Sequence, residues 1–195
     1  MALSPDLDGS SGGFPQRDAL AEESRANAIL DPDTASPWLI VSEDQKSARW
    51  ASEWQDVPMT PERFDDSPSV LGCKGFASGR HFWEVDVKRG QGWAVGVARE
   101  SVNRKGGIRY SPEEGIWAIW LWNGQYHALT SPETPLSPSK TPEKIRVCLD
   151  YAERRVAFSD ADTKAPIFTF PPASFGGERI LPIFWVMGTQ ITLCP

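Results

Sequence analysis

Residues 116–129 read IWAIWLWNGQYHAL, two apolar runs that are joined by Asn123-Gly124. Both residues of an Asn-Gly pair tolerate a positive φ, which the tight two-residue turn between antiparallel strands requires. An Asn-Gly pair flanked by apolar runs is therefore a strong short-range indication of a β-hairpin. The stretch predicts two adjacent antiparallel strands at this point of the chain.

The faces of the first run follow from the two-residue period of a strand. Trp117, Ile119 and Leu121 share one face and form a convincing core-facing set. Trp120 and Trp122 then lie side by side on the opposite face. Two interpretations of that second face stay open. Either the two indoles form a platform for a binding partner, or they pack beneath another part of the chain.

Short apolar runs separated by turn residues continue on both sides of this hairpin. Residues 83–87, Trp-Glu-Val-Asp-Val, alternate apolar and acidic side chains, as a half-buried strand does. The segment 131–142 contains four prolines and is expected to be an extended loop. With no long helix between the strands, the pattern predicts an all-β sandwich or barrel. The eleven expected strands cover residues 38–41, 48–50, 82–87, 93–97, 116–122, 126–129, 145–149, 156–158, 167–170, 180–186 and 191–193.

The first thirty residues differ from this β pattern. Residues 1–16 are rich in Gly, Ser, Pro and Asp and are expected to be a flexible lead. Residues 17–30 contain good helix formers and neither Gly nor Pro, so we expect a short N-terminal helix there. Asp31-Pro32 would end it, because the residue before a proline avoids helical dihedral angles.

Composition and charge exclude several classes of protein. The chain has 195 residues, nine of them tryptophan, and a net charge of −6, which argues against a nucleic-acid-binding surface. Three widely spaced cysteines, Cys73, Cys148 and Cys194, are typical of a reducing compartment. The chain begins without an apolar signal core, and its longest apolar run, 116–122, is too short to span a bilayer. We expect a cytoplasmic protein without direct membrane contact.

A search for catalytic and metal-binding residues finds little. The two histidines, His81 and His127, are far apart in sequence and lack further ligands at a metal-binding spacing. No nucleophile elbow or phosphate-binding loop occurs. We therefore expect no catalytic residues, no metal and no cofactor. A lectin-type sugar site is a further hypothesis, although its best acidic loop, Asp160-Ala-Asp162, lacks the other oxygen ligands that calcium needs.

Basic residues gather around two of the expected strands. A solvated rim is the simpler interpretation, because exposed charges are ordinary on a protein surface. The sharper hypothesis is an anion or phosphate pocket at one loop end. Its candidate residues are His81, Lys88, Arg89 and Arg104.

Three sequence motifs, taken in order, identify a family. The first is LDPDTA at 30–35 followed by WLIVSED at 38–44, the second is GRHFWEVDV at 79–87, and the third is LDY at 149–151. Together they resemble the PRY-SPRY domain of tripartite-motif ubiquitin ligases and butyrophilins. The third motif departs slightly, since Ala152 stands where the family usually has Glu.

The resemblance implies a fold and a domain division. It implies a bent, two-sheet antiparallel β-sandwich of the concanavalin-like kind, with PRY at about 31–78 and SPRY at about 79–195. In full-length relatives a RING, a B-box and a coiled coil precede this domain, and the segment 17–30 would connect to that coiled coil. None of those zinc modules occurs in this sequence. The domain is expected to be monomeric by itself, within a parent that dimerises through its coiled coil.

The resemblance also implies a function. It predicts a non-enzymatic module that recognises a protein or peptide, as the target-binding part of a tripartite-motif protein in innate immunity. The alternative is the intracellular domain of a butyrophilin-type receptor that senses small diphosphates, in which His81, Lys88 and Arg89 resemble part of the pocket. One family member binds the Fc part of immunoglobulin, but the loop at 185–189 is much shorter here, so Fc specificity is not carried over. The expected partner-binding residues are Trp120, Trp122, Glu100, Asn123, Trp185 and Met187.

Overall fold

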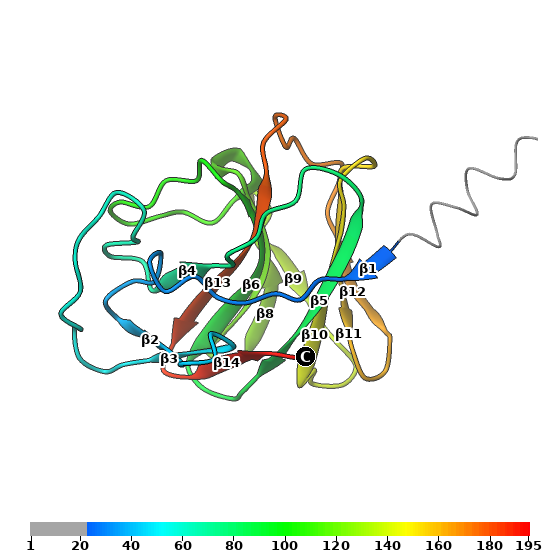
Figure 1. The fold of residues 1–195 in the computed structure, drawn as a ribbon. Coiled ribbons are helices and arrows are strands. Elements are labelled where there is room, and N and C mark those ends of the chain that lie inside the picture. The colour runs from blue at the N-terminus through cyan, green and yellow to red at the C-terminus, as the bar shows by residue number, and fades with distance from the viewer. Residues whose placement is uncertain (1–22) are drawn as a thin grey trace, which may run out of the picture.

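The structure, a computed structural model, describes residues 23–195 and consists of two β-sheets that pack face to face (Figure 1). Strands within each sheet pair antiparallel, with the exception of the first strand, which runs parallel to its neighbour. One 3-10 turn, η2 (Pro112–Glu114), precedes a central strand. The predicted all-β, two-sheet architecture is confirmed.

The larger sheet has eight strands. Seven follow the order β12-β11-β10-β5-β14-β3-β2, and β1 pairs with β5 beside that path. Their bounds are β1 (Glu23–Arg25), β2 (Leu39–Val41), β3 (Ser47–Trp50), β5 (Arg80–Val87), β10 (Lys144–Asp150), β11 (Arg155–Asp160), β12 (Pro166–Thr169) and β14 (Gln190–Leu193).

The smaller sheet has six strands in the order β4-β13-β6-β7-β8-β9. The turn Asn123-Gly124 joins β7 to β8, with φ angles of 49° and 81°, so the predicted hairpin is confirmed. The bounds are β4 (Ser69–Leu71), β6 (Gly92–Arg99), β7 (Ile116–Trp122), β8 (Gln125–Ala128), β9 (Thr134–Leu136) and β13 (Ile180–Met187).

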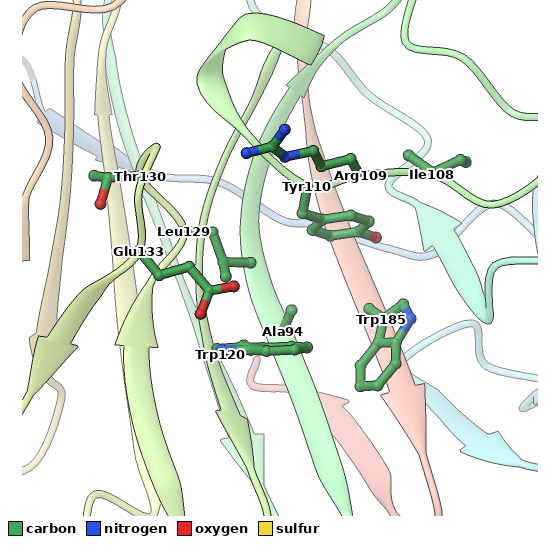
Figure 2. A pocket seen from close by; sticks show the side chains of 9 residues that line it. All are labelled: Ala94, Ile108, Arg109, Tyr110, Trp120, Leu129, Thr130, Glu133 and Trp185. Carbon is green, nitrogen blue, oxygen red and sulfur yellow. The ribbon is translucent and has the colours of Figure 1, made fainter.

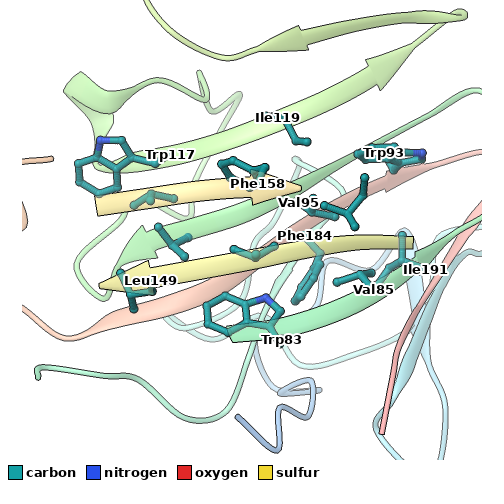
Figure 3. Close-up of a cluster of buried hydrophobic side chains, with 14 of the residues drawn as sticks. Trp83, Val85, Trp93, Val95, Trp117, Ile119, Leu149, Phe158, Phe184 and Ile191 are labelled. Atoms are coloured by element: carbon teal, nitrogen blue, oxygen red, sulfur yellow. The ribbon is translucent and has the colours of Figure 1, made fainter. Parts of the chain in front are cut away.

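The core lies between the two sheets and is built around large aromatic side chains (Figure 3). Trp83 comes from the larger sheet, and Trp93 and Trp117 come from the smaller one; all three are fully buried. Ile119 lies with them, while Leu121 is partly buried at the margin of the core. The two-residue period therefore placed the inward face of β7 correctly.

All eleven expected strands are present, each with ends within two residues of the expected ones. Three short strands were not expected: β1, β4 and β9. Strand β9 lies within the segment that was expected to be a loop, and it contains Pro135. A proline lacks the backbone N–H that a central strand needs, and β9 accommodates it because it forms the edge of its sheet.

The helix expected over 17–30 is wrong for residues 23–30, which are extended; residues 1–22, with the expected lead, lie outside the described residues. Ala26 and Ala28 pack against the core, Leu30 is buried, and the three alternate with a two-residue period. The N–H of Ala26 donates to the carbonyl of Phe82 on β5. A short helix with so few apolar residues is only marginally stable, whereas the open edge of β5 offers backbone partners.

Candidate functional site

The outer face of the smaller sheet carries three of the tryptophans that lie outside the core. Strands β13, β6 and β7 are neighbours in register, so residues on this face form rows of three. One row is Trp185–Ala94–Trp120, and the next is Met187–Gly92–Trp122. A small residue on β6 stands at the centre of each row. The large side chains on both flanks can therefore approach one another across the middle strand.

Three indoles meet in this way, and we refer to Trp120, Trp122 and Trp185 as the tryptophan cluster. The rings of Trp120 and Trp122 are stacked, with centroids 6.0 Å apart and planes inclined by 14°. The ring of Trp185 lies 5.8 Å from Trp120 and 5.7 Å from Trp122. All three side chains are half-buried, so the cluster presents aromatic surface to solvent while holding its geometry by mutual contact.

Gly92 makes room for this arrangement. A Cβ atom at this position would lie 2.5 Å from Cε3 of Trp122 and 2.8 Å from the carbonyl oxygen of Leu121. Neither distance is compatible with a real methyl group, so any larger residue would displace the indole or the strand. The ring of Trp122 rests on the backbone of β6 because position 92 has no side chain.

The rest of this face is covered. The next residues along β7, Ile116 and Ala118, are buried in a second apolar cluster with Phe64, Val102 and Leu129 from loops and strand ends. Trp120 borders that cluster. Both interpretations of the second face of β7 therefore describe a part of it, since one end packs under loops and the other end stays half-exposed.

A pocket of about 270 Å³ opens beside the tryptophan cluster (Figure 2). Trp120 and Trp185 flank it, and Ala94 lies between them. The loop before η2 and the segment between β8 and β9 contribute the remaining side chains. These are Ile108, Arg109, Tyr110, Leu129, Thr130 and Glu133.

Tyr110 connects the pocket to the sheet edge. Its hydroxyl and that of Ser69 lie 2.6 Å apart in a hydrogen bond, and Ser69 pairs with Trp185 in the β4–β13 ladder. Burial raises the pKa of the Tyr110 phenol, so the side chain is neutral at physiological pH. The pocket is thus bordered by an uncharged phenol that is held in one orientation.

The structure brings together four of the expected partner-binding residues: Trp120, Trp122, Trp185 and Met187. Asn123 is exposed in the adjoining turn, and its N–H donates to the carbonyl of Gln91. Its side chain does not line the pocket.

Glu100 lies elsewhere. It follows the far end of β6, six residues from Ala94, which corresponds to about 20 Å along an extended chain. There it forms an ion pair with Arg179 at 2.8 Å. The structure therefore does not place Glu100 with the tryptophan cluster.

The four candidate anion-binding residues do not converge. His81 is near the start of β5, where its Nε2 lies 2.7 Å from the carbonyl oxygen of Ser78. Lys88 and Arg89 follow the end of the same strand, about 23 Å away along an extended chain. Arg104 donates to the backbone carbonyls of Glu62 and Glu100 and so holds two loops together. No single pocket among the described residues is lined by all four.

Other candidate sites also have structural roles or no partners of the right kind. Asp160 is buried, and its Oδ1 accepts the N–H groups of Asp162 and Thr163, which forms a turn. His127 lies opposite Trp120 on β8, and its Nδ1 is buried without a hydrogen-bond partner.

Among residues 23–195 no group of three His, Cys, Asp or Glu side chains could hold a metal ion. Within the same residues, no helix has the length and hydropathy that crossing a membrane requires.

Sequence reasoning missed Ala94, Tyr110 and Glu133 as members of the site. Ala94 gives no signal by its type, and its importance comes from its place between two tryptophans. Tyr110 and Glu133 come from segments whose conformation no periodicity predicts. Only the paired register of the strands and the loop paths assemble these residues.

Two family descriptions match the chain. The SPRY domain matches residues 80–194, and the SPRY-associated domain, PRY, matches residues 28–76. The two matches together span nearly all of the described residues.

Curated relatives cover most of the chain. It is 49% identical over 168 residues to E3 ubiquitin-protein ligase TRIM15 of Sus scrofa, which covers 84% of this chain and 36% of that protein. It is 45% identical over 174 residues to E3 ubiquitin-protein ligase TRIM21 of Bos taurus, and this match covers 85% of this chain and 37% of that protein. Butyrophilin subfamily 1 member A1 of Bos taurus is 40% identical over 193 residues, and this match covers 93% of this chain and 36% of that protein. The chain thus spans little more than a third of these relatives.

Solved structures share the fold. The crystal structure of the TRIM65 PSpry domain matches with a TM-score of 0.76 and 20% sequence identity, over 100% of both chains. The stonustoxin structure matches with a TM-score of 0.75 and 20% identity, over 87% of this chain and 29% of that one. At this level of identity the likeness concerns the arrangement of the strands alone.

Proposed function

Because this chain belongs to the SPRY domain family and carries the associated PRY domain, we propose that it binds a protein partner through the tryptophan cluster. PRY-SPRY domains of tripartite-motif proteins are protein-interaction modules. One observation supports the choice of surface. Trp120, Trp122 and Trp185 are half-exposed together, beside a pocket, at the one end of this face that loops leave open.

The energetics of association favour such a surface. Clustered aromatic side chains are the residues that most often dominate binding energy, and truncating one can cost about 2 kcal/mol or more. The cluster is also preorganised, since each indole is in contact with the other two. A rigid anchor loses little conformational entropy when a partner binds.

The surrounding loops define how far the proposed surface extends. The segment 131–138 carries Glu133, and the turn after Met187 borders the cluster at its other side. Glu100 is not included, because it is paired with Arg179 at the distant end of β6. The partner is therefore expected to cover the ends of β7 and β13 rather than the whole rim.

The wider role is also a proposal. The chain covers about 36–37% of relatives that are named as ubiquitin ligases, so we propose that it selects the target of a longer, cytoplasmic protein of that kind. By itself the domain would be a non-catalytic monomer. A role in innate immunity stays a prediction.

Binding of a partner to tryptophan variants tests the proposal. A partner captured from cytosol with the wild-type chain is titrated by calorimetry against Trp120→Ala and Trp122→Ala. We expect each variant to remain folded and to bind at least about tenfold more weakly.

Trp54→Ala is the matched control. Trp54 is also an exposed tryptophan, with 53% of its surface accessible, but it packs against Trp38 in the PRY region instead of the cluster. Its removal is expected to change affinity less than twofold. Unchanged affinity in both cluster variants would overturn the proposal.

A further inference from the structure

We propose that the pocket beside the tryptophan cluster receives a basic side chain, lysine or arginine, from the partner. This inference rests on the proposed function and specifies its chemistry. Aromatic rings border the pocket, and a carboxylate without a partner lies above one of them (Figure 2). Rings and carboxylate together favour a cation over a neutral or acidic group.

The aromatic walls come from Trp120, Trp185 and Tyr110. Cations are attracted to the faces of aromatic rings, and tryptophan attracts them most strongly. The indole planes of Trp120 and Trp185 are inclined by 57° with centroids 5.8 Å apart, so they form two sides of an angular niche. Ala94 and Leu129 add apolar surface on which the aliphatic stem of a lysine or arginine can lie.

Glu133 supplies the charge. It is exposed and forms no hydrogen bond or ion pair with any of residues 23–195, and Figure 2 shows its carboxylate pointing toward the ring of Trp120. A cation seated on that ring would lie between the indole and the carboxylate. An ion pair formed there would gain strength from the indole, which excludes water on one side.

Arg109, which also lines the pocket, does not reverse this preference. The pKa of Glu113 is lowered by a hydrogen bond from Ser131 and, in addition, by the charge of Arg109. The charge of Arg109 therefore acts on Glu113 as well as on the pocket. Of the residues that line the pocket, only Arg109 and Glu133 are charged, and their charges are opposite. The preference for a cation therefore comes from the place of the Glu133 carboxylate beside the ring of Trp120, and not from a net charge.

Capped peptides Gly-Gly-X-Gly-Gly test the inference, with X as lysine, arginine, norleucine or glutamate. Each is titrated into the ¹⁵N-labelled chain while the indole N–H signals of Trp120 and Trp185 are followed. We expect the lysine or arginine peptide to shift both signals saturably. The norleucine peptide, which keeps the stem and lacks the charge, is expected to bind at least about fivefold more weakly.

Glu133→Gln separates the charge from the shape of the pocket. This variant is expected to bind the basic peptides about fivefold or more weakly than the wild-type chain does, and to bind the norleucine peptide with unchanged affinity. Arg109→Gln is expected to bind the basic peptides more tightly. Glu153→Gln, at an exposed turn, is the matched control for Glu133→Gln.

Three results would overturn the inference: norleucine or glutamate peptides that bind as tightly as the basic ones, basic peptides insensitive to Glu133→Gln, or no shift with any peptide. These failures differ from failure of the proposed function. If the proposed function itself is wrong, the full partner will bind Trp120→Ala and Trp122→Ala with the same affinity as the wild-type chain. If a neutral side chain of the partner occupies the pocket, the proposed binding surface still holds, and the inference of a basic side chain is wrong.

Discussion

Trp120 and Trp185 lie on strands that are not neighbours, and yet their ring centroids are only 5.8 Å apart. Strand β6 runs between them, and Ala94 stands directly across from both in the paired register. A methyl group is short enough to let two indoles approach over it, whereas a longer side chain would separate them. The pocket therefore depends on the absence of bulk at position 94.

Replacing Ala94 with leucine should fill the pocket from its floor. Ala94 itself is buried, but the indoles of Trp120 and Trp185 beside it are half-exposed and have room to move outward, so we expect the fold to persist and partner affinity to fall at least about tenfold. Calorimetric titration of the captured partner checks this. Ala157→Leu, on the outer face of the larger sheet, is the control and should bind normally. Normal binding by Ala94→Leu would show that the pocket is not used.

Adding a methyl group at Gly92 should destabilise the domain. The new Cβ would overlap Cε3 of Trp122 and the carbonyl of Leu121, and relief requires movement of both. We expect Gly92→Ala to lower the free energy of unfolding by about 1–3 kcal/mol in urea denaturation. Gly107→Ala adds the same atom where nothing lies within 4 Å and should have little effect. Equal stability of the two variants would contradict the close approach of Trp122.

The stabilising contribution of Glu84 should depend on pH. Its side chain accepts bonds from Arg25 at 3.1 Å and from Arg146 at 2.8 Å, and so fastens β1 and β10 to β5. Burial by itself raises the pKa of Glu84, but the hydrogen bonds from Arg146 and Arg25 outweigh it, so the folded pKa lies below 4.5.

A lowered folded pKa means that this stability is present above the unfolded pKa and is lost as pH falls through the folded one. Glu84→Gln should lower the free energy of unfolding by about 1–3 kcal/mol at pH 7. The difference from wild type should shrink below pH 4.5. Denaturation at several pH values measures it, with the exposed Glu53→Gln as control. A difference that is constant from pH 7 to 3 would refute the linkage.

Buried Arg63 should be essential to the PRY loops. Its guanidinium donates to the carbonyls of Pro58 at 2.7 Å, Pro32 at 3.0 Å and Ala35 at 2.7 Å. Arg63→Met removes all three bonds and leaves the carbonyls without these donors, so we expect a loss of about 2–4 kcal/mol. Thermal and urea unfolding measure the loss. The exposed Arg49→Met serves as control, and similar stability of both variants would exclude an anchoring role for Arg63.

The sequence predictions are right where the structure depends on local interactions, and they are wrong where it depends on residues far apart in the chain. The hairpin at Asn123-Gly124 and the core face with Trp117 depend on local geometry, namely a turn with positive φ and a two-residue period, and both are confirmed. The segment 23–30 was wrongly expected to be helical because its helix propensity is local, while the edge of β5 that it pairs with is distant in sequence. Long-range pairing overrides weak propensity.

The sequence by itself determined the two-sheet β-sandwich, its family and the choice of Trp120 and Trp122 as tryptophans outside the core. Periodicity and turn chemistry predict an all-β sandwich or barrel and the two faces of β7, because each is encoded within a few residues. The two-sheet form and the family follow from the resemblance carried by the motifs at 30–44, 79–87 and 149–151. Only the tertiary structure decided that Trp185 and Met187 join them, that Glu100 does not, and that Ala94, Tyr110 and Glu133 complete a pocket. Strand register and loop paths bring those residues together from segments far apart in the chain, and no local pattern specifies distances across a sheet.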